Sequence, residues 1–169
     1  MQRKRDLIRI LMVCHGNICR SPMAEFVIKD MIEREHLGKL FYVASAATSM
    51  EEIGNPVHQG TRETLKRYGI STDGKYAVQL SRKDYDQYDY LIGMEQRNVT
   101  NMLRILGQDP EGKVRRLLDF SSNPRDIADP WYTGDFDRTY HDVYEGCKAL
   151  FEYILTQELK RGQALEPEA

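Results

Sequence analysis

The sequence predicts an α/β protein in which a parallel sheet is covered by helices on both faces. Two observations predict this class. Short aliphatic runs alternate along the chain with longer segments in which apolar residues recur at helical spacing. The first of these runs also ends in a glycine-containing loop that leads directly into a helical segment. Strands joined by crossover helices lie parallel, so we expect one parallel sheet.

The composition fits a single globular domain. We expect one domain over residues 1–169, with an ordered core from about residue 7 to residue 160, because this length allows a substantial core. Charged residues make up 30% and hydrophobic residues 41% of the chain, an ordinary globular balance. The net charge of −2 argues against general nucleic-acid binding, and no stretch has the length of a membrane span.

The first predicted strand and helix flank a short loop. Leu7 to Val13 is a mostly aliphatic run that predicts a buried strand, and the loop Cys14 to Ser21 follows it. Pro22 suits the first turn of a helix, Ser21 is its expected N-cap, and Gly38 is its expected C-terminal end. The apolar stripe of this helix consists of Met23, Phe26, Val27, Met31 and Ile32.

The middle of the chain continues the alternation. Leu40 to Ala44 predicts a second strand, and Ser45 to His58 a polar loop. A second helix is expected from about Pro56 to Tyr68, with Gly69 ending it. Ser81 to Asp84 is typical of a cap before a short helical turn.

The second half predicts two more strands and two more helices. Tyr88 to Met94 and Val114 to Leu118 are the expected strands, and Asn98 to Leu106 is a helix between them. A loop from Ser121 to Gly134 precedes a final helix from Phe136 to about Leu159. The expected buried stripes of these helices are Val99, Met102, Leu103 and Leu106, and then Tyr140, Val143, Tyr144, Cys147, Leu150 and Ile154.

The loop after the first strand has the residues of a site that holds a phosphate against a nucleophilic sulfur. In parallel sheets ligands bind beyond the carboxyl ends of the strands, where Cys14 lies. A cysteine titrates near ~8.5, and a helix N-terminus with nearby cations lowers this value. Gly16 permits a positive φ and Asn17 tolerates one, so backbone amides can form an anion cradle. Arg20 offers a planar fork for two phosphate oxygens, and Ser21 can donate to the thiolate.

Two other interpretations of this loop are less favoured by its residues. A nucleotide-binding loop is disfavoured because no Gly-Lys-Ser/Thr follows the glycine. A cysteine in such a loop is often only a small buried apolar residue. The combination of a preceding strand, Gly16, Asn17 and Arg20 in one loop favours the functional interpretation.

Expulsion of an alkoxide or phenoxide from a phosphate ester needs a proton donor opposite the nucleophile. Asp129 is the best candidate, stiffened by Pro130, and Trp131 and Tyr132 could form an aromatic wall for a ring-bearing substrate. The alternative is that Asp-Pro is only a turn signal and that the aromatic residues are ordinary packing. The spacing leaves both interpretations open.

The cysteine count and the N-terminus indicate the cytoplasm. Three cysteines without an export signal do not suggest a disulfide framework, and no Cys/His pairing has zinc-ligand spacing. The basic segment Met1 to Arg5 precedes an apolar run that is short, contains Arg9 and has no cleavage site, unlike a signal peptide.

The segment Val13-Cys14-His15-Gly16-Asn17-Ile18-Cys19-Arg20-Ser21-Pro22 resembles the signature of low-molecular-weight protein-tyrosine phosphatases nearly residue for residue. The order and spacing of further motifs match from about Ile8 to Tyr153. These motifs are Ser45-Ala46-Ala47-Thr48-Ser49, Ile53-Gly54-Asn55-Pro56, Asp89-Tyr90-Leu91-Ile92-Gly93-Met94 and Asp129-Pro130-Trp131-Tyr132.

The resemblance implies a three-layer, flavodoxin-like phosphatase fold with a four-stranded parallel sheet flanked by helices. It implies that Cys14 is the nucleophile that becomes phosphocysteine, that Arg20 binds the phosphoryl group, and that Asp129 protonates the leaving phenol and then activates water. It also implies a phosphotyrosine protein substrate, a site for phosphate or another oxyanion, and no metal or other cofactor. The residues implied at the substrate site are His15, Gly16, Asn17, Ile18, Cys19, Ser21, Trp131 and Tyr132.

Related activities on the same scaffold are disfavoured. Arsenate reductases similar to this family add resolving cysteines near the third strand, but here no cysteine lies between Cys19 and Cys147. Protein-arginine phosphatases have a threonine at the position of Ile18. A phosphate-sensing or redox binding protein with the same loop but little turnover is the alternative from another class. The presence of both Cys14 and Asp129 weighs against it.

The sequence also departs from the family pattern. A His-x-Ala/Ser-Arg stretch that supports the loop in many members is replaced here by Lys75 to Val78. The rim position often held by an aromatic residue is Glu51, beside Met50, and an acidic rim would disfavour acidic phosphopeptides.

The sequence predicts the roles of the remaining cysteines and histidines less specifically. In family members with both loop cysteines these can form a reversible disulfide, so Cys19 is either a redox partner of Cys14 or a small residue that fills the loop. Cys147 is expected in the core. His36, His58 and His141 are expected at the surface without partners.

Overall fold

The computed structural model describes residues 6–168, and the basic N-terminal segment discussed above lies outside them. Four parallel strands form one sheet in the order β2-β1-β3-β4. Their bounds are β1 Ile8–Cys14, β2 Phe41–Ala47, β3 Tyr90–Gly93 and β4 Val114–Arg116. The predicted α/β class, the number of strands and their parallel arrangement are confirmed.

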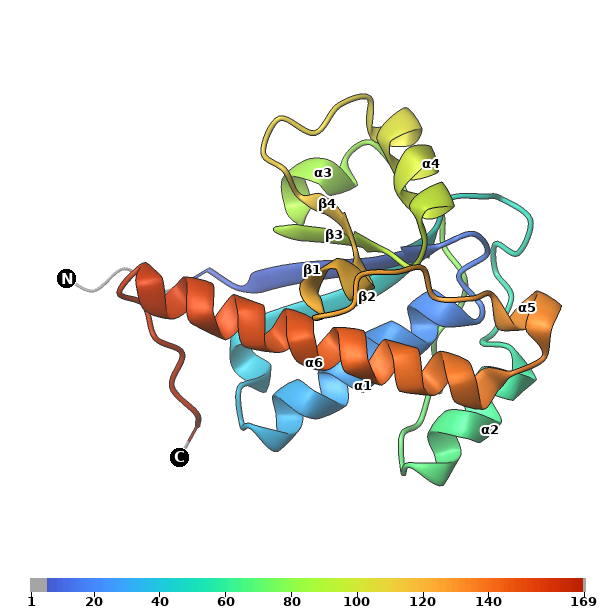
Figure 1. Cartoon of the computed structure of the whole chain (residues 1–169), viewed down its shortest axis with the longest axis horizontal. Coiled ribbons are helices and arrows are strands. Elements are labelled where there is room, and N and C mark those ends of the chain that lie inside the picture. The colour runs from blue at the N-terminus through green and yellow to red at the C-terminus, as the bar shows by residue number, and fades with distance from the viewer. Residues whose placement is uncertain (1–5, 169) are drawn as a thin grey trace.

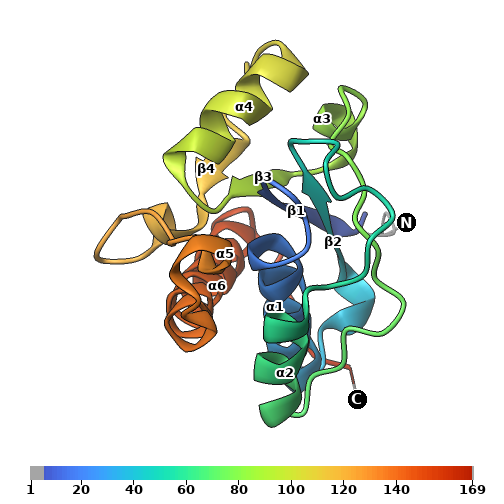
Figure 2. The ribbon, with the colours of Figure 1, turned by 90° about the vertical axis from the view of Figure 1, so that its right-hand side faces the viewer.

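Helices cover both faces of the sheet and make three layers. The α-helices are α1 Arg20–Arg34, α2 Gln59–Arg67, α3 Asp84–Gln87, α4 Gln96–Leu106, α5 Pro130–Thr133 and α6 Phe136–Lys160, and the short 3-10 helices span Gly38–Leu40 and Leu117–Phe120. Figures 1 and 2 show α1 and α6 on one face of the sheet, with α2 outside them, and α3 and α4 on the other face.

The central strand β1 is buried on both faces, which explains its unbroken apolar sequence. Ile10 and Met12 pack into the cluster under α1 and α6, whereas Leu11 and Val13 pack into the cluster under α4. Each such buried side chain contributes roughly 1.5–3 kcal/mol of transfer free energy. This burial fixes the register of β1, and therefore the position of Cys14 at its carboxyl end.

The first helix differs from the prediction at both ends. Cys19, not Ser21, is its N-cap residue, and Ser21 lies inside the first turn, where its hydroxyl contacts the Cys14 sulfur instead of capping the helix. The helix ends at Arg34 rather than at Gly38, because His36 adopts a left-handed conformation with φ of 58°.

Other helix and strand boundaries differ from the predicted ones by a few residues. The second strand extends to Ala47, so that Ser45 belongs to the sheet and not to a loop. The second helix begins at Gln59 rather than near Pro56, and β4 is shorter than predicted because Leu117 begins a 3-10 turn. The loop predicted before the last helix contains the short helix α5.

Two predicted stripe residues are not in the core. Leu103 and Tyr144 are 37% and 46% exposed, because the buried stripes of α4 and α6 are narrower than the sequence pattern. Cys147 is fully buried, as predicted.

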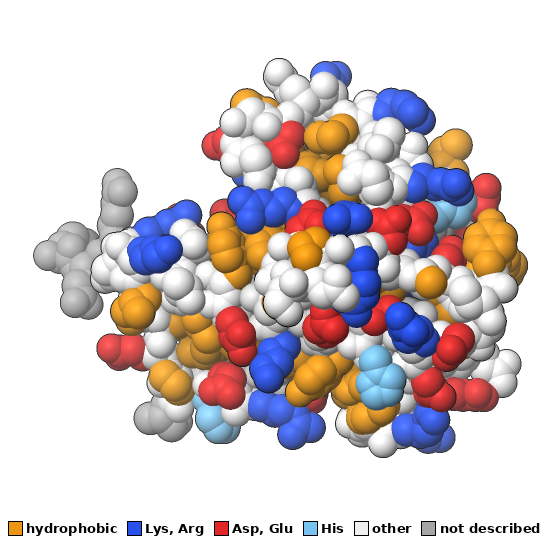
Figure 3. Space-filling model, in the orientation of Figure 1, with side chains coloured by type: hydrophobic (Ala, Val, Ile, Leu, Met, Phe, Trp, Pro, Cys, Tyr) orange, Lys and Arg blue, Asp and Glu red, His pale blue; other side chains and the backbone are white. Residues whose placement is uncertain are grey.

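The surface mixes charges of both signs. In the face shown in Figure 3, basic and acidic side chains are interspersed, without a single-sign field of the kind that favours nucleic-acid binding. Among residues 6–168, no helix has the length and apolar character needed to cross a membrane.

Candidate active site

The loop between β1 and α1 forms one wall of a small pocket at the carboxyl end of the sheet. The pocket is lined by Cys14, His15, Gly16, Ile18, Cys19, Arg20, Glu51, Glu52, Asp129, Trp131 and Tyr132. It therefore brings together most of the residues that the sequence singled out. A larger hollow lies at the opposite end of the sheet, between Asp89, Glu111 and Arg161, and no cysteine lines it.

Cys14 is buried at the bottom of this pocket, beside the first turn of α1. Its sulfur lies 3.0 Å from the Ser21 hydroxyl and accepts a hydrogen bond of 3.3 Å from the backbone amide of Asn17. Both contacts and the helix N-terminus stabilise a negative charge on sulfur. These are contacts that a nucleophilic sulfur requires.

Asn17 and Ser21, which the sequence placed among the substrate residues, lie behind the loop instead of lining the pocket. Asn17 has a φ of 58°, as expected. Its amide nitrogen donates to Ser21 Oγ at 2.8 Å and to Ser45 Oγ at 2.9 Å, and its oxygen accepts from the Val78 amide at 3.1 Å. All donors of this amide are in use, which fixes the left-handed turn of the loop.

Gly16 serves the loop differently from the expectation. It is not among the glycines with positive φ. A Cβ at this position would come within 3.3 Å of Glu52 Cγ, so the absence of a side chain allows the loop containing Glu52 to pack closely.

Glu25 and Lys75 form a buried ion pair behind this network. Lys75 begins the stretch in which the sequence departs from the family pattern. Ser45 Oγ donates to Glu25 at 2.6 Å, and Lys29 also pairs with Glu25. Lys75 Nζ donates to the Ser45 carbonyl at 2.8 Å and lies 3.9 Å from Glu25. Burial lowers the pKa of Lys75, and the Glu25 charge opposes this effect.

These contacts set the direction of the hydrogen bonds that reach the nucleophile. Because Ser45 donates to a carboxylate, its oxygen is free to accept from Asn17. Because Ser21 Oγ also accepts from Asn17, its own proton is left for one of two acceptors, the Cys14 sulfur at 3.0 Å or the more distant Ala46 carbonyl at 3.5 Å. Sequence reasoning missed Glu25, which lies in a helix without a local motif, and gave Ser45 no role, although Ser45 begins one of the segments that resemble the family.

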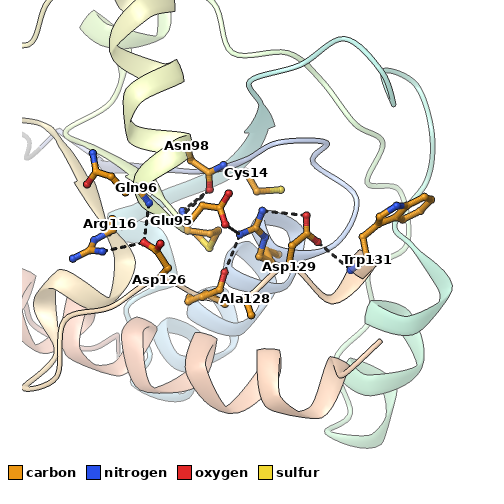
Figure 4. Close-up of polar contacts among 12 residues, drawn as sticks. Cys14, Glu95, Gln96, Asn98, Arg116, Asp126, Ala128, Asp129 and Trp131 are labelled. Carbon is orange, nitrogen blue, oxygen red and sulfur yellow. Dashed lines mark hydrogen bonds and ion pairs between the residues drawn. The ribbon is translucent and has the colours of Figure 1, made fainter. Parts of the chain in front are cut away.

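Arg20 is buried and its guanidinium is held from two sides. Nη1 donates to Glu95 Oε2 and to the Ile127 carbonyl, both at 2.9 Å, and Nη2 donates to Asp129 Oδ2 at 3.3 Å. Figure 4 shows these contacts converging from the ends of β3 and of the loop before α5. The Asn98 side chain accepts from the Glu95 amide at 3.1 Å and anchors the start of α4.

Asp129 is a turn and cap residue, and it also faces the pocket. It caps α5, since Oδ1 accepts from the Trp131 amide at 3.0 Å, and its other oxygen faces Arg20 in the pocket. Trp131 and Tyr132 are 58% and 83% exposed and stand at the mouth of the pocket. They are therefore a wall and not core packing.

The rim differs from the expectation in one residue. Glu51 Oε2 lies 3.1 Å from His15 Nε2, and Glu52 also lines the pocket. Met50 is exposed and is not among the residues that line the pocket.

The three cysteines are free thiols. Burial, followed by the proximity of Cys14, raises the pKa of Cys19 to about 12, so Cys19 stays protonated at neutral pH. His58, which was expected to lack partners, contacts Trp131 and Phe136 beside the pocket. Within residues 6–168, no group of three His, Cys, Asp or Glu side chains could hold a metal ion.

Comparison with known proteins agrees with this geometry. The family model described as low molecular weight phosphotyrosine protein phosphatase matches residues 9–164. The chain is 40% identical to the low molecular weight protein-tyrosine-phosphatase YfkJ of Bacillus subtilis over 150 residues, which cover 88% of this chain and 96% of that protein. It is 36% identical to PtpA of Staphylococcus epidermidis over 150 residues, which cover 88% and 95%.

Solved structures agree with the fold. The crystal structure of YfkJ from Bacillus subtilis superposes with a TM-score of 0.87 at 39% identity, covering 90% of this chain and 98% of that chain. The low molecular weight protein tyrosine phosphatase from Streptococcus pyogenes superposes with a TM-score of 0.80 at 35% identity, covering 93% and 99%.

Proposed function

The chain belongs to the low molecular weight phosphotyrosine protein phosphatase family, and we propose that it hydrolyses phosphotyrosine through a phosphocysteine intermediate on Cys14, with Asp129 as general acid and base. It is a protein-tyrosine phosphatase, a phosphoric monoester hydrolase that acts on phosphoproteins and binds an oxyanion, which argues against the non-catalytic sensor. One observation supports the proposed mechanism above the others: the Cys14 sulfur, the Arg20 guanidinium and the Asp129 carboxyl converge on one pocket.

In the first step the amides of the loop and Arg20 bind the phosphoryl oxygens, and the Cys14 sulfur attacks phosphorus. The S–P bond forms as the P–O bond to tyrosine breaks, and the phenolate takes the proton of Asp129. Arg20 pairs with both Glu95 and Asp129. A phosphoryl dianion competes with the Asp129 carboxyl for the Arg20 guanidinium.

In the second step water hydrolyses the phosphocysteine. The Asp129 carboxylate takes a proton from the attacking water, the new P–O bond forms, and the S–P bond breaks to regenerate the Cys14 thiolate. Arg20 and the loop amides stabilise the equatorial oxygens in both transition states. Gly16 and the side chains of His15, Ile18 and Cys19 shape the cradle, while the side chains of Asn17 and Ser21 support it from behind.

The shape of the pocket favours an aryl phosphate. The aromatic wall of Trp131 and Tyr132 and the apolar Ile18 suit a flat ring, and the acidic pair Glu51 and Glu52 disfavours acidic sequences beside the phosphotyrosine. We expect kcat/KM for phosphotyrosine peptides to exceed kcat/KM for phosphoserine and phosphoarginine peptides by at least about 100-fold. A phosphoserine side chain is too short to carry its phosphate past Trp131 and Tyr132 to Cys14.

The test is a side-by-side assay of the three phosphopeptides with one flanking sequence, with Cys14→Ser as the blank. A kcat/KM for phosphoarginine or phosphoserine equal to that for phosphotyrosine would contradict the proposed substrate class.

We expect Lys75→Met to slow the alkylation of Cys14 by iodoacetamide at neutral pH by about two- to tenfold. The substitution removes the donor to Ser45 and the charge beside Glu25, and so loosens the hydrogen bonds that end at the sulfur. Because the pKa of Cys19 is raised to about 12, labelling at neutral pH reports Cys14. Peptide mapping of the labelled protein measures the rate.

Lys113→Met is the matched control for this substitution. The two side chains are similarly buried, at 11% and 15% exposure, and both donate to a backbone carbonyl next to a glutamate. Lys113 lies at the opposite end of the sheet. Equal alkylation rates in the two variants would show that Lys75 does not support the nucleophile.

We propose a single domain that works in the cytoplasm, in agreement with three free thiols. Peroxide would oxidise Cys14 to a sulfenic acid, and the Cys19 thiol would then condense with it to form a disulfide and release water. This step would protect the nucleophile against further oxidation.

A further inference from the structure

His58 lies where three segments around the active site meet. Its backbone amide donates to the Ile18 carbonyl of the phosphate loop at 2.8 Å. Its imidazole stacks on Phe136, the first residue of α6, with centroids 5.2 Å apart and planes at 16°. The edge of the Trp131 ring contacts it at a centroid distance of 5.7 Å and an angle of 77°.

The imidazole is held in one orientation. Its Nδ1 accepts from the Gly60 amide at 3.0 Å, which makes His58 the N-cap of α2 and places the ring proton on Nε2. Phe136 lies against Gly60, where a Cβ would overlap its ring. The cap and the stack together prevent the His58 ring from swinging away from Trp131.

The residue that this ring contacts belongs to the same short turn as the proposed acid. The Trp131 amide donates to Asp129 Oδ1 at 3.0 Å, while Asp129 Oδ2 faces Arg20. Trp131 is 58% exposed and has few neighbours, so the contact with His58 is an important restraint on its position.

We propose that His58 is a positioning residue for dephosphorylation: its ring holds Trp131, and through the α5 turn the Asp129 carboxyl, in place against the phosphate loop. The pocket then fits a flat aromatic leaving group with the acid next to its oxygen. This inference rests on the proposed function. The competing interpretation is that His58 only caps α2.

Three substitutions separate the ring of His58 from its cap. His58→Asn keeps a good N-cap and removes the ring, His58→Phe keeps a ring and removes the cap, and His58→Ala removes both. Thermal stability depends on the N-cap, so it should fall in the Phe and Ala variants, which lack it. The emission and anisotropy of Trp131, the one tryptophan in the sequence, should follow the ring and change in the Asn and Ala variants.

Catalytic activity should depend on the presence of a ring at position 58 as well. We expect kcat/KM for a phosphotyrosine peptide to fall about three- to tenfold in His58→Asn, matching the loss of one aromatic pair, and His58→Phe to recover most of it. KM should rise for aryl phosphates more than for a small alkyl phosphate, and kcat should fall most for poor leaving groups, which need Asp129. A residue that only caps α2 would produce neither pattern.

His141→Asn is the control, because this ring also contacts an aromatic residue, Tyr140, but lies on the outside of α6. The proposal is overturned if His58→Asn keeps wild-type tryptophan emission and kcat/KM. It is also overturned if kcat/KM falls as far in His58→Phe as in His58→Asn. The tryptophan signal needs no turnover, so it tests the contact even if Cys14 proves not to be the nucleophile.

Discussion

Replacement of Cys14 by serine is expected to lower the rate of phosphotyrosine hydrolysis by at least about four orders of magnitude. The Ser21 hydroxyl at 3.0 Å and the Asn17 amide at 3.3 Å stabilise a charged sulfur, whereas a serine hydroxyl stays protonated at neutral pH. Inorganic phosphate should still bind the variant, since Arg20 and the loop amides are unchanged. Steady-state kinetics and phosphate titration by calorimetry measure the two quantities.

Cys147→Ser is the control for this substitution. Cys147 is also buried, and its sulfur contacts the Ala24 carbonyl at 3.5 Å, within the core between α1 and α6. We expect this variant to keep near-normal kcat. If Cys14→Ser retained more than about a hundredth of the wild-type rate, sulfur could not be the attacking atom.

The second large effect is expected from Asp129→Asn. Asparagine keeps the cap of α5, because its side-chain oxygen can still accept from the Trp131 amide, but it has no proton to donate to the leaving phenolate. We expect kcat/KM for a phosphotyrosine peptide to fall by about 10²–10⁴-fold, and kcat/KM for aryl phosphates with acidic phenols to fall far less. The measurement is kcat/KM, which reports the first step alone, against leaving-group acidity for a series of aryl phosphates.

Asp135→Asn is the matched control, since Asp135 caps α6 by accepting from the Arg138 amide at 2.9 Å and does not line the active-site pocket. Its substitution should leave the leaving-group dependence unchanged. A uniform loss across all leaving groups in Asp129→Asn would remove Asp129 as the proton donor.

The parts of the fold that the sequence predicted are those with a local pattern. The central strands β1 and β3 are short apolar runs because they are buried on both faces, and this pattern needs no knowledge of their partners. The phosphate loop is contiguous, so its residues could be identified together. The start of α1 was mispredicted because the hydroxyl of Ser21, a good capping group, contacts the sulfur of Cys14 instead.

The missed site residues have partners far away in the sequence. Glu95 contacts Arg20 across 75 positions, and Ser45 contacts Asn17 across 28. Only the strand order, which places the carboxyl end of β3 beside that of β1, makes the first of these pairs foreseeable. His58 has no such signal, because its contacts depend on how α2, α5 and α6 pack.

The central claim is that the phosphoryl group passes through the sulfur of Cys14. The most direct measurement is rapid quenching of Asp129→Asn with p-nitrophenyl phosphate, followed by mass spectrometry of the peptide that contains Cys14. This substrate needs no proton donor in the first step, while the second step lacks its general base, so the intermediate should accumulate. The account predicts one burst equivalent of phenol and a phosphoryl group on Cys14. Turnover without a burst, or a phosphoryl group on another residue such as His15, would contradict it.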